Sequence, residues 1–213
     1  MAQPERRRIP EATVARLPLY YRILVELTAE GTATVASEDL AQRAGVNAAQ
    51  VRKDLSYLGS FGTRGVGYDV DHLLFEMSAQ LGLTEDRPVV IVGAGNLGQA
   101  LSKYGGFGAR GFPVVALVDS DPAKIGTIIN GLEVRPPAEL SGICRDRHVA
   151  IGIVATPAGP AQDVVDALRE AGVCSVLNFA PAIVTAPEGV TLRKVDLAVE
   201  LQILSFYQHR AGI

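Results

Sequence analysis

The sequence predicts an α/β protein built from an N-terminal winged helix-turn-helix domain and a doubly wound parallel sheet, with a last helix that packs into another subunit. Three observations predict this fold. Two short helical segments are joined at a glycine and followed by a glycine-rich hairpin. Short, continuously apolar runs then alternate with helical segments, as in a parallel sheet buried on both faces. A glycine-rich loop follows the first of these runs.

The composition is that of a globular protein, because 48% of the 213 residues are hydrophobic and 20% are charged, with a formal net charge of −3. Cys144 and Cys174 form no CxxC motif, and no histidine cluster accompanies them, which argues against a zinc site or a disulfide scaffold. No apolar run approaches the roughly 20 residues of a membrane span. We expect a cytoplasmic protein without a metal.

The first domain is expected over residues 1–83. Ser37 is the predicted N-cap of the second helix, which stops at Gly45. Asn47 can cap the third helix, with Gln50 in a capping-box position. The expected elements are helices over 14–31, 37–45 and 47–58, a hairpin or wing over 59–70, and an amphipathic helix over 71–83.

The second domain is expected over residues 84–196, after a polar stretch that ends at Pro88. The segment 197–213 is expected to be a dimerisation helix, because its apolar residues do not fall on a single stripe. The expected strands lie at 89–92, 114–118, 149–155 and 175–179, with helices at about 96–104 and 160–171.

The loop "VVIVGAGNLGQAL" has the GxGxxG spacing of a dinucleotide-binding turn of the Rossmann fold. Gly93 allows the tight turn, Gly95 lets the backbone approach a pyrophosphate, and Gly98 lets helix and strand pack closely. Asp119 and Asp121 follow the next strand, where an acid can bond the adenosine ribose and disfavour a 2′-phosphate. The pattern favours NAD over NADP; the alternative is a structural turn beside solvated acids.

The third helix is predicted to bind DNA. Val51, Leu55 and Leu58 face the core at helical spacing, and this leaves Gln50, Arg52, Lys53, Asp54 and Tyr57 toward solvent. The arginines Arg6, Arg7 and Arg8 of the tail and Arg64 of the hairpin occupy other places where a winged helix touches DNA. The alternative is a solvated helix face.

Catalytic groups are sparse. The histidines are His72, His148 and His209, and none is paired with a carboxylate at a place suited to hydride transfer. Residues 155–160, "ATPAGP", are expected at the carboxyl end of a strand, where they shape a wall near the nicotinamide or form an ordinary turn. We predict that the protein is not an enzyme.

The whole chain resembles the Rex family of redox-sensing transcriptional repressors. The resemblance rests on "RKDLSYLGSFGTRGVGYDV", "VGAGNLGQAL", "VDSDPAKIG", "LNFAP" and "VDLAVELQ", in this order. It implies a homodimer in which each subunit joins a winged helix to a Rossmann domain and ends in a domain-swapped helix. It further implies that the protein senses the NADH/NAD⁺ ratio, and that NADH releases it from operator DNA.

Site residues follow from the resemblance and the motifs together. Asp196 is implied to pair with Arg16 in the DNA-binding form and with Tyr104 in the NADH form. The residues expected to bind the dinucleotide are Gly93, Ala94, Gly95, Asn96, Leu97, Gly98, Tyr104, Asp119, Asp121, Thr156, Pro157, Asn178 and Phe206. Those expected to bind DNA are Arg6, Arg7, Arg8, Asn47, Gln50, Arg52, Lys53, Tyr57 and Arg64.

Two other functions are compatible with parts of the sequence. An NAD-dependent oxidoreductase would need a general base and a substrate pocket. A CoA- or nucleotide-binding metabolic subunit shares the second domain but leaves the winged helix unexplained.

Overall fold

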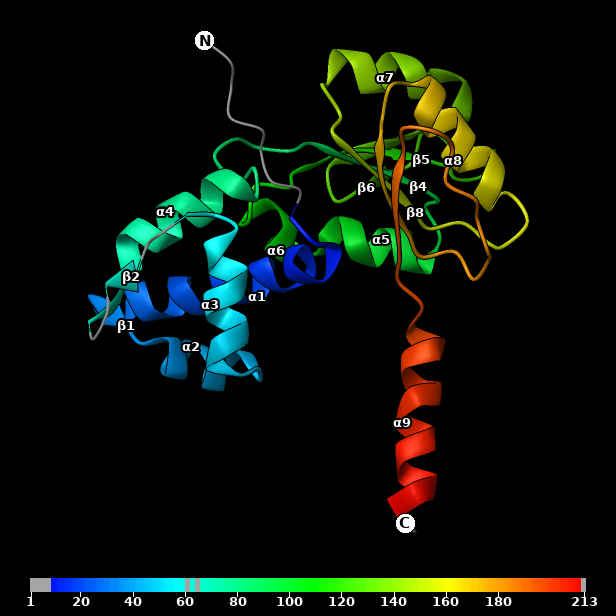
Figure 1. The fold of residues 1–213 in the computed structure, drawn as a ribbon. Coiled ribbons are helices and arrows are strands. Elements are labelled where there is room, and N and C mark those ends of the chain that lie inside the picture. The colour runs from blue at the N-terminus through cyan, green and yellow to red at the C-terminus, as the bar shows by residue number, and fades with distance from the viewer. Residues whose placement is uncertain (1–8, 60–61, 64–65, 212–213) are drawn as a thin grey trace. The chain divides into compact units, whose positions relative to one another are not determined.

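The computed structural model describes residues 9–59, 62–63 and 66–211, and the chain divides into two compact units, residues 1–85 and 86–213 (Figure 1). The division falls within the polar stretch that ends at Pro88. No helix in the described ranges is long and apolar enough to cross a membrane.

The first unit is a helix-turn-helix with a small antiparallel sheet, as predicted. Its helices are α1 (Glu11–Ala29), α2 (Ser37–Ala44), α3 (Ala48–Ser56) and α4 (Val70–Gln80). Its strands are β1 (Thr34–Val35), β2 (Gly62–Thr63) and β3 (Gly67–Asp69), paired in the order β1-β3-β2.

The caps of α2 and α3 fix the turn between them. Gly45 ends α2 in the left-handed region at φ 68°, which a glycine adopts without steric cost. The Asn47 side chain accepts a hydrogen bond from the Gln50 amide at 2.8 Å and so caps α3, as predicted. The prediction for Ser37 was wrong, because α2 begins at Ser37 and Ala36 holds the N-cap position. No return bond completes a capping box, since the Gln50 side chain bonds Asp54 instead.

The core of the first unit lies between α1, α2, α3 and α4. Val51 and Leu55 are buried as predicted, whereas Leu58 is only partly buried. Leu73 and Met77 attach α4 to the same cluster. The packing of α3 into this core therefore uses the apolar face that its sequence period predicts.

The second unit is a seven-stranded sheet in the order β10-β9-β8-β4-β5-β7-β6. All its pairings are parallel except β6 with β7. Four strands match predicted ones closely: β4 (Val89–Val92), β5 (Val114–Val118), β8 (Ile151–Val154) and β9 (Ser175–Asn178). The strands β6 (Ile128–Ile129), β7 (Leu132–Arg135) and β10 (Thr191–Lys194) were not predicted.

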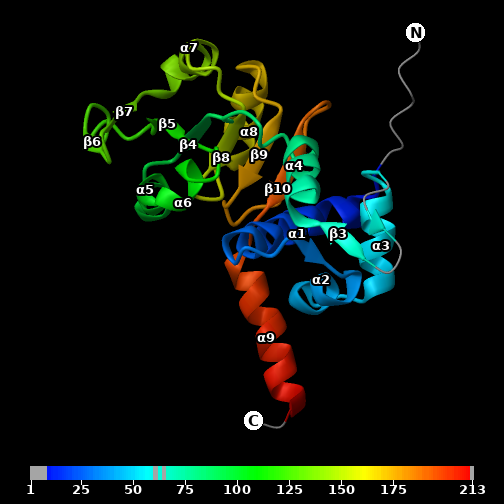
Figure 2. The ribbon, with the colours of Figure 1, turned by 90° about the vertical axis from the view of Figure 1, so that its left-hand side faces the viewer.

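Helices cover both faces of this sheet, which makes it doubly wound (Figures 1 and 2). One face packs against α5 (Asn96–Lys103) and α6 (Gly105–Gly108) through Leu101 and Phe107. The other packs against α7 (Leu140–Asp146) and α8 (Ala161–Glu170), with a short 3₁₀ turn, η1 (Pro137–Glu139), before α7. The order of strands reverses on either side of β4, and ligands of open α/β sheets bind at such a point.

The last helix, α9 (Leu197–Ala211), is exposed from residue 197 to residue 210. Its large apolar residues are Leu197, Val199, Leu201, Ile203, Leu204, Phe206 and Tyr207, which are 43–67% exposed. At 100° per residue these positions spread around the helix rather than along one stripe. This amount of exposed apolar surface is unusual for a monomer.

Candidate functional site

A cavity of about 590 Å³ lies at the carboxyl ends of β4, β5 and β8. This volume suits a small-molecule ligand, and the position is the one where the strand order reverses. Of the residues predicted for the dinucleotide, the cavity is lined by Gly93, Gly95, Asp119, Asp121, Thr156 and Pro157.

Two glycines of the loop are required by the fold itself. Gly93 has φ 107°, and a Cβ there would lie 2.5 Å from the carbonyl oxygen of Ala155. A Cβ at Gly98 would overlap the carbonyl oxygen of Gly93. These two positions let the loop turn sharply and let α5 pack against β4, as the motif predicts.

The remaining glycine of the motif is not required by the chain. Gly95 has φ −77°, and a Cβ there would meet no atom within 4 Å. It lines the cavity and holds the N-cap position of α5 without a side-chain cap, so the first amides of the helix face an open space. This is the place where a phosphate group would need close approach to the backbone.

A buried hydroxyl in the same cavity also lacks a partner. The Oγ1 atom of Thr156 is buried and makes no hydrogen bond to any described residue. A buried hydroxyl without a hydrogen bond destabilises the folded protein, so a ligand that forms this hydrogen bond is bound more tightly. The bare backbone at Gly95 and this hydroxyl both fit the dinucleotide that the sequence predicts.

Asp119 holds the glycine loop in place. Its carboxylate accepts hydrogen bonds from the Ala94 amide at 2.7 Å, the Asp121 amide at 2.8 Å and Lys124 Nζ at 3.0 Å. Burial raises the pKa of Asp119, but these bonds outweigh burial and lower it below its usual value. Asp119 therefore has a structural role, since it holds the glycine loop. The predicted contact between Asp119 and a ribose would be a second role of the same carboxylate. Sequence reasoning missed Lys124, although its place five residues after Asp119 was a usable signal.

The other predicted dinucleotide residues lie outside this cavity or hold the fold. Asn178 is buried at the end of β9, where its side-chain oxygen accepts the Ala180 amide at 2.8 Å. Tyr104 is 52% exposed, and its hydroxyl accepts a hydrogen bond from Arg110 at 3.3 Å. Phe206 is exposed on α9. Ala94, Asn96 and Leu97 belong to the loop and the first turn of α5.

The exposed face of α3 carries the predicted DNA contacts. Lys53 is exposed, and no carboxylate of the described residues forms an ion pair with it. Arg52 donates to Ser37 Oγ at 2.9 Å and to Glu38 at 3.1 Å in an exposed pair that contributes little stability. Asn47 is exposed and Tyr57 partly so. Arg6, Arg7, Arg8 and Arg64 lie outside the described residues.

Asp54 is not on the exposed face, and this corrects the prediction. Its side chain is fully buried because residue 54 shares the core face of α3 with Val51 and Leu55. The carboxylate accepts hydrogen bonds from four side chains: Thr13 at 2.9 Å, Arg16 at 2.6 and 2.8 Å, Tyr20 at 2.9 Å and Gln50 at 2.8 Å.

This cluster keeps Asp54 ionised. Burial raises the pKa of Asp54, but the bonds from Arg16, Gln50, Tyr20 and Thr13 outweigh burial and set it at about 2. Burial, together with the bond to Asp54, raises the pKa of Tyr20 to about 12. The hydrogen bond to Asp54 likewise raises the pKa of Arg16 above its ordinary value. The cluster ties α1 to α3 across 34–41 residues of sequence.

The three predicted switch residues have other partners in this structure. Arg16 bonds Asp54, and Asp196 bonds Lys194 at 3.0 Å while accepting the Ala198 amide at the start of α9. The hydrogen bond from Lys194 lowers the pKa of Asp196. The pairing of Asp196 with Arg16 or Tyr104 stays a prediction.

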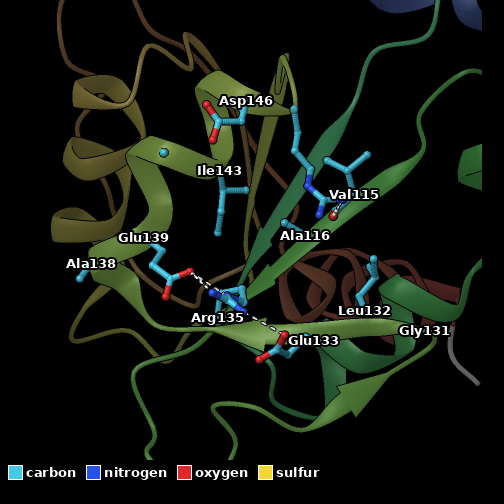
Figure 3. Close-up of a pocket in the computed structure, with 12 residues that line it drawn as sticks. Val115, Ala116, Gly131, Leu132, Glu133, Arg135, Ala138, Glu139, Ile143 and Asp146 are labelled. Atoms are coloured by element: carbon cyan, nitrogen blue, oxygen red, sulfur yellow. Dashed lines mark hydrogen bonds and ion pairs between the residues drawn. The ribbon is translucent and has the colours of Figure 1, made fainter.

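A second cavity, of about 650 Å³, lies between α7 and the strands β5 and β7 (Figure 3). Its central cation, Arg135, bonds Glu139 at 2.7 Å and Glu133 at 2.9 Å and so has its charge balanced. In the described part of the chain no three side chains of the metal-binding types are grouped to hold an ion. The site with unsatisfied groups is the cavity at the glycine loop.

A winged helix joined to a sheet with a ligand cavity defines a class, the DNA-binding regulators that a small molecule controls. Residues 8–56 match the family model "Putative DNA-binding protein N-terminus", and residues 84–182 match "CoA binding domain". The two matches cover the two units separately.

Full-length relatives narrow this class. The redox-sensing transcriptional repressor Rex of Streptomyces coelicolor is 59% identical over 204 residues, which cover 96% of this chain and 79% of the relative. Rex of Carboxydothermus hydrogenoformans is 51% identical, with 93% and 96% covered. The crystal structure of the Rex-family repressor RSP with β-NAD⁺ and operator DNA matches with a TM-score of 0.90 at 33% identity, over 96% of this chain and 94% of that one. The chain belongs to the Rex family of redox-sensing transcriptional repressors, as its sequence predicts.

The glycine loop allows a paired test of fold against ligand approach. We expect Gly98→Ala to lower the free energy of unfolding by about 2 kcal/mol or more, because its Cβ overlaps the Gly93 carbonyl. Gly95→Ala is expected to stay within about 0.5 kcal/mol of the wild type. Urea unfolding followed by circular dichroism measures both. Equal stability of all three proteins would contradict this assignment.

The Asp54 cluster predicts an acid-dependent stability. The folded pKa is about 2 against an ordinary value of 3.8, so the carboxylate stabilises the fold above pH 4 and loses this effect as the pH falls toward 2. Between pH 5 and 2 the wild type is expected to lose about 2 kcal/mol more than Asp54→Asn. Thermal and urea unfolding at several pH values measure this difference. Asp39→Asn, an exposed change on α2, is the matched control and should behave as the wild type. The same pH profile for Asp54→Asn and the wild type would contradict the account.

Proposed function

We propose that the protein binds an inverted-repeat operator as a homodimer, represses transcription, and is released when NADH occupies the cavity at the glycine loop. NAD⁺ in the same cavity is compatible with repression. Because a repressor acts on chromosomal DNA, we also propose a cytoplasmic location.

The observation that carries this proposal is the bare backbone at Gly95. The chain does not need a glycine there, whereas a dinucleotide does. The orphaned hydroxyl of Thr156 supports the same ligand. The Rex-family repressor RSP, whose fold this chain shares, has been crystallised with β-NAD⁺ and operator DNA and with β-NADH.

The acidic side of the cavity favours NAD(H) over NADP(H). Asp119 and Asp121 lie there with Lys124, whose Nζ is 3.0 and 3.6 Å from their carboxylates. Two carboxylates and one ammonium group leave one net negative charge, which disfavours a 2′-phosphate. Asp121, with 45% of its side chain exposed, is the carboxylate with more freedom to reach a ribose.

The dinucleotide is proposed to be a signal rather than a reagent. Among the residues that line the cavity, the titratable ones are Asp119, Asp121, Lys124 and Asp163. Asp119 and Lys124 bond each other, and Asp163 is exposed. Hydride transfer to a substrate needs an acid or base matched to that step, and this set supplies none. We therefore propose that the protein is not an enzyme.

The DNA face is proposed to be the exposed side of α3. Lys53 is available for a phosphate, and the only ion pair of Arg52 among the described residues is with the exposed Glu38. Two such helices in a twofold dimer would read half-sites about 34 Å apart, or a multiple of that distance.

The function is tested by operator affinity at saturating NADH and at saturating NAD⁺, measured on a duplex selected from a randomised inverted-repeat pool. We expect NADH to weaken binding by about 5- to 150-fold relative to NAD⁺. Gly95→Ala is expected to bind the duplex but to lose the NADH response. Gly105→Ala, whose Cβ also meets no atom within 4 Å, is the matched control and should respond as the wild type. Equal affinity of the wild type with both ligands refutes redox sensing.

If Asp196 pairs with an arginine of α1 in the DNA-binding form, as the family resemblance implies, we propose that this arginine is Arg22 rather than Arg16. Releasing Arg16 would leave the buried Asp54 without its countercharge, which costs about 3–5 kcal/mol. Arg22 lies on the same helix, is exposed, and forms no ion pair with the described residues. It can change partners without this cost.

We expect Arg22→Ala to weaken operator binding in the presence of NAD⁺ while its thermal midpoint stays near that of the wild type. Arg16→Ala is expected to lower the midpoint, because it uncovers the Asp54 carboxylate. Both quantities are measured on both variants. Normal operator binding by Arg22→Ala would remove this residue from the switch.

The homodimer is proposed to form through α9, because this helix exposes apolar residues on more than one side. We expect Leu201→Glu combined with Leu204→Glu to sediment as a monomer, since both side chains are more than 60% exposed here and would be buried between subunits. Gln202→Glu combined with Gln208→Glu adds the same two charges on the same helix without removing an apolar side chain, and should stay dimeric. A stable dimer of the double variant would contradict dimerisation through α9.

A further inference from the structure

The side chain of Gln50 is held in one orientation. Its Nε2 atom donates to Asp54 Oδ1 at 2.8 Å, one helical turn further along α3. Asp54 is fully buried and is itself fixed by Arg16, Tyr20 and Thr13. The partner of the Gln50 amide is therefore a rigid group and not a mobile surface side chain.

The chemistry of Asp54 decides which end of the amide faces it. An ionised carboxylate only accepts hydrogen bonds, and the bonds around Asp54 keep its pKa at about 2. The amide nitrogen of Gln50 must face inward, because the reverse orientation would bring two acceptors together. The oxygen, Oε1, is the other end of the amide. It receives no hydrogen bond from the described residues and is not one of their buried unpaired atoms.

We propose that Asp54 is a positioning residue for DNA recognition, which turns the Gln50 amide oxygen outward to accept a hydrogen bond from the exocyclic amine of a base in the major groove. This inference rests on the proposed operator binding and deepens it. Adenine N6 and cytosine N4 are the major-groove edges that donate such a hydrogen, whereas guanine and thymine present acceptors or a methyl group. At one strand position in each half-site, adenine or cytosine is accepted and guanine or thymine is rejected.

The role differs from that of Lys53 on the same helix. Lys53 is an exposed cation with no ion-pair partner among the described residues, which suits a phosphate. A phosphate contact strengthens binding to every duplex and carries no base preference. Gln50, held by a buried acid, offers a directional acceptor and affects base preference.

The test uses the full-length protein and a duplex that the wild type selects from a randomised inverted-repeat pool. One base of the duplex is changed at a time. Replacing an adenine by purine removes the N6 amino group, and replacing a cytosine by pyrimidin-2-one removes the N4 amino group. The wild type is expected to lose about 3- to 10-fold in affinity at one position per half-site. Loss with purine identifies adenine as the contacted base, and loss with pyrimidin-2-one identifies cytosine.

Gln50→Met keeps the length of the side chain and leaves Asp54 with Arg16, Tyr20 and Thr13. It is expected to bind the natural and the modified duplex equally well. In Asp54→Asn the new amide can accept from Gln50 or donate to it, so the Gln50 amide is no longer held in one orientation. We therefore expect this variant to have a smaller ratio of affinities for the natural and the modified duplex. A loss of stability in the variant protein does not change this expectation, because the ratio compares two duplexes on the same protein. Lys53→Ala is the contrast, since it should weaken both duplexes by the same factor. Gln80→Met, an exposed change on α4, is the matched control and should retain the wild-type ratio.

The outcomes separate this inference from the proposed function. A wild type that binds no duplex overturns DNA binding and, with it, the reading of a base by Gln50. A wild type that binds DNA but loses nothing with any modified base overturns the inference alone. So does a Gln50→Met variant that retains the wild-type ratio.

Discussion

The buried carboxylate of Asp54 sets the structure of the DNA-binding unit. A charge that is removed from water must be matched by donors, and those donors come from Thr13, Arg16 and Tyr20 on α1 and from Gln50 on α3. These hydrogen bonds fix the position of α3 relative to α1. They also engage Arg16, the arginine that the family resemblance assigns to a switch. Removing one partner of a buried ion pair of this kind costs about 3–5 kcal/mol, because it leaves an uncompensated charge in the core.

The glycines of the loop differ in why a glycine is present: two are required by the fold, and the third leaves space for a ligand. Gly93 and Gly98 are required because the surrounding backbone leaves no room for a Cβ, whereas Gly95 has space that the chain does not use. Asp119 then ties the loop to the end of β5 through the Ala94 amide. The result is a cavity with a bare backbone and an unsatisfied hydroxyl but few groups for acid-base chemistry. This combination suits a ligand that is sensed.

Local patterns predicted most of the fold and part of the site. The four buried strands, the helix-turn-helix and the glycine loop follow from period and turn chemistry, which depend on neighbouring residues. The role of Asp54 could not be predicted, because Thr13 and Tyr20 lie 41 and 34 residues away and only the folded chain brings them together. Short strands such as β6 carry too few residues to show a period. The bonds of Arg16 to Asp54 and of Asp119 to the Ala94 amide could not be predicted for the same reason, since these partners lie 38 and 25 residues away.

We propose that the dinucleotide cavity and the DNA face of α3 are coupled through the dimer. Linkage requires that, if NADH weakens operator binding, operator DNA weakens NADH binding by the same factor. The direct measurement is the dissociation constant of NADH, from its fluorescence, for the free protein and for the protein saturated with operator. We predict a weaker NADH affinity in the DNA complex, by about 5- to 150-fold, and little change for NAD⁺. The same NADH affinity with and without operator would contradict the account.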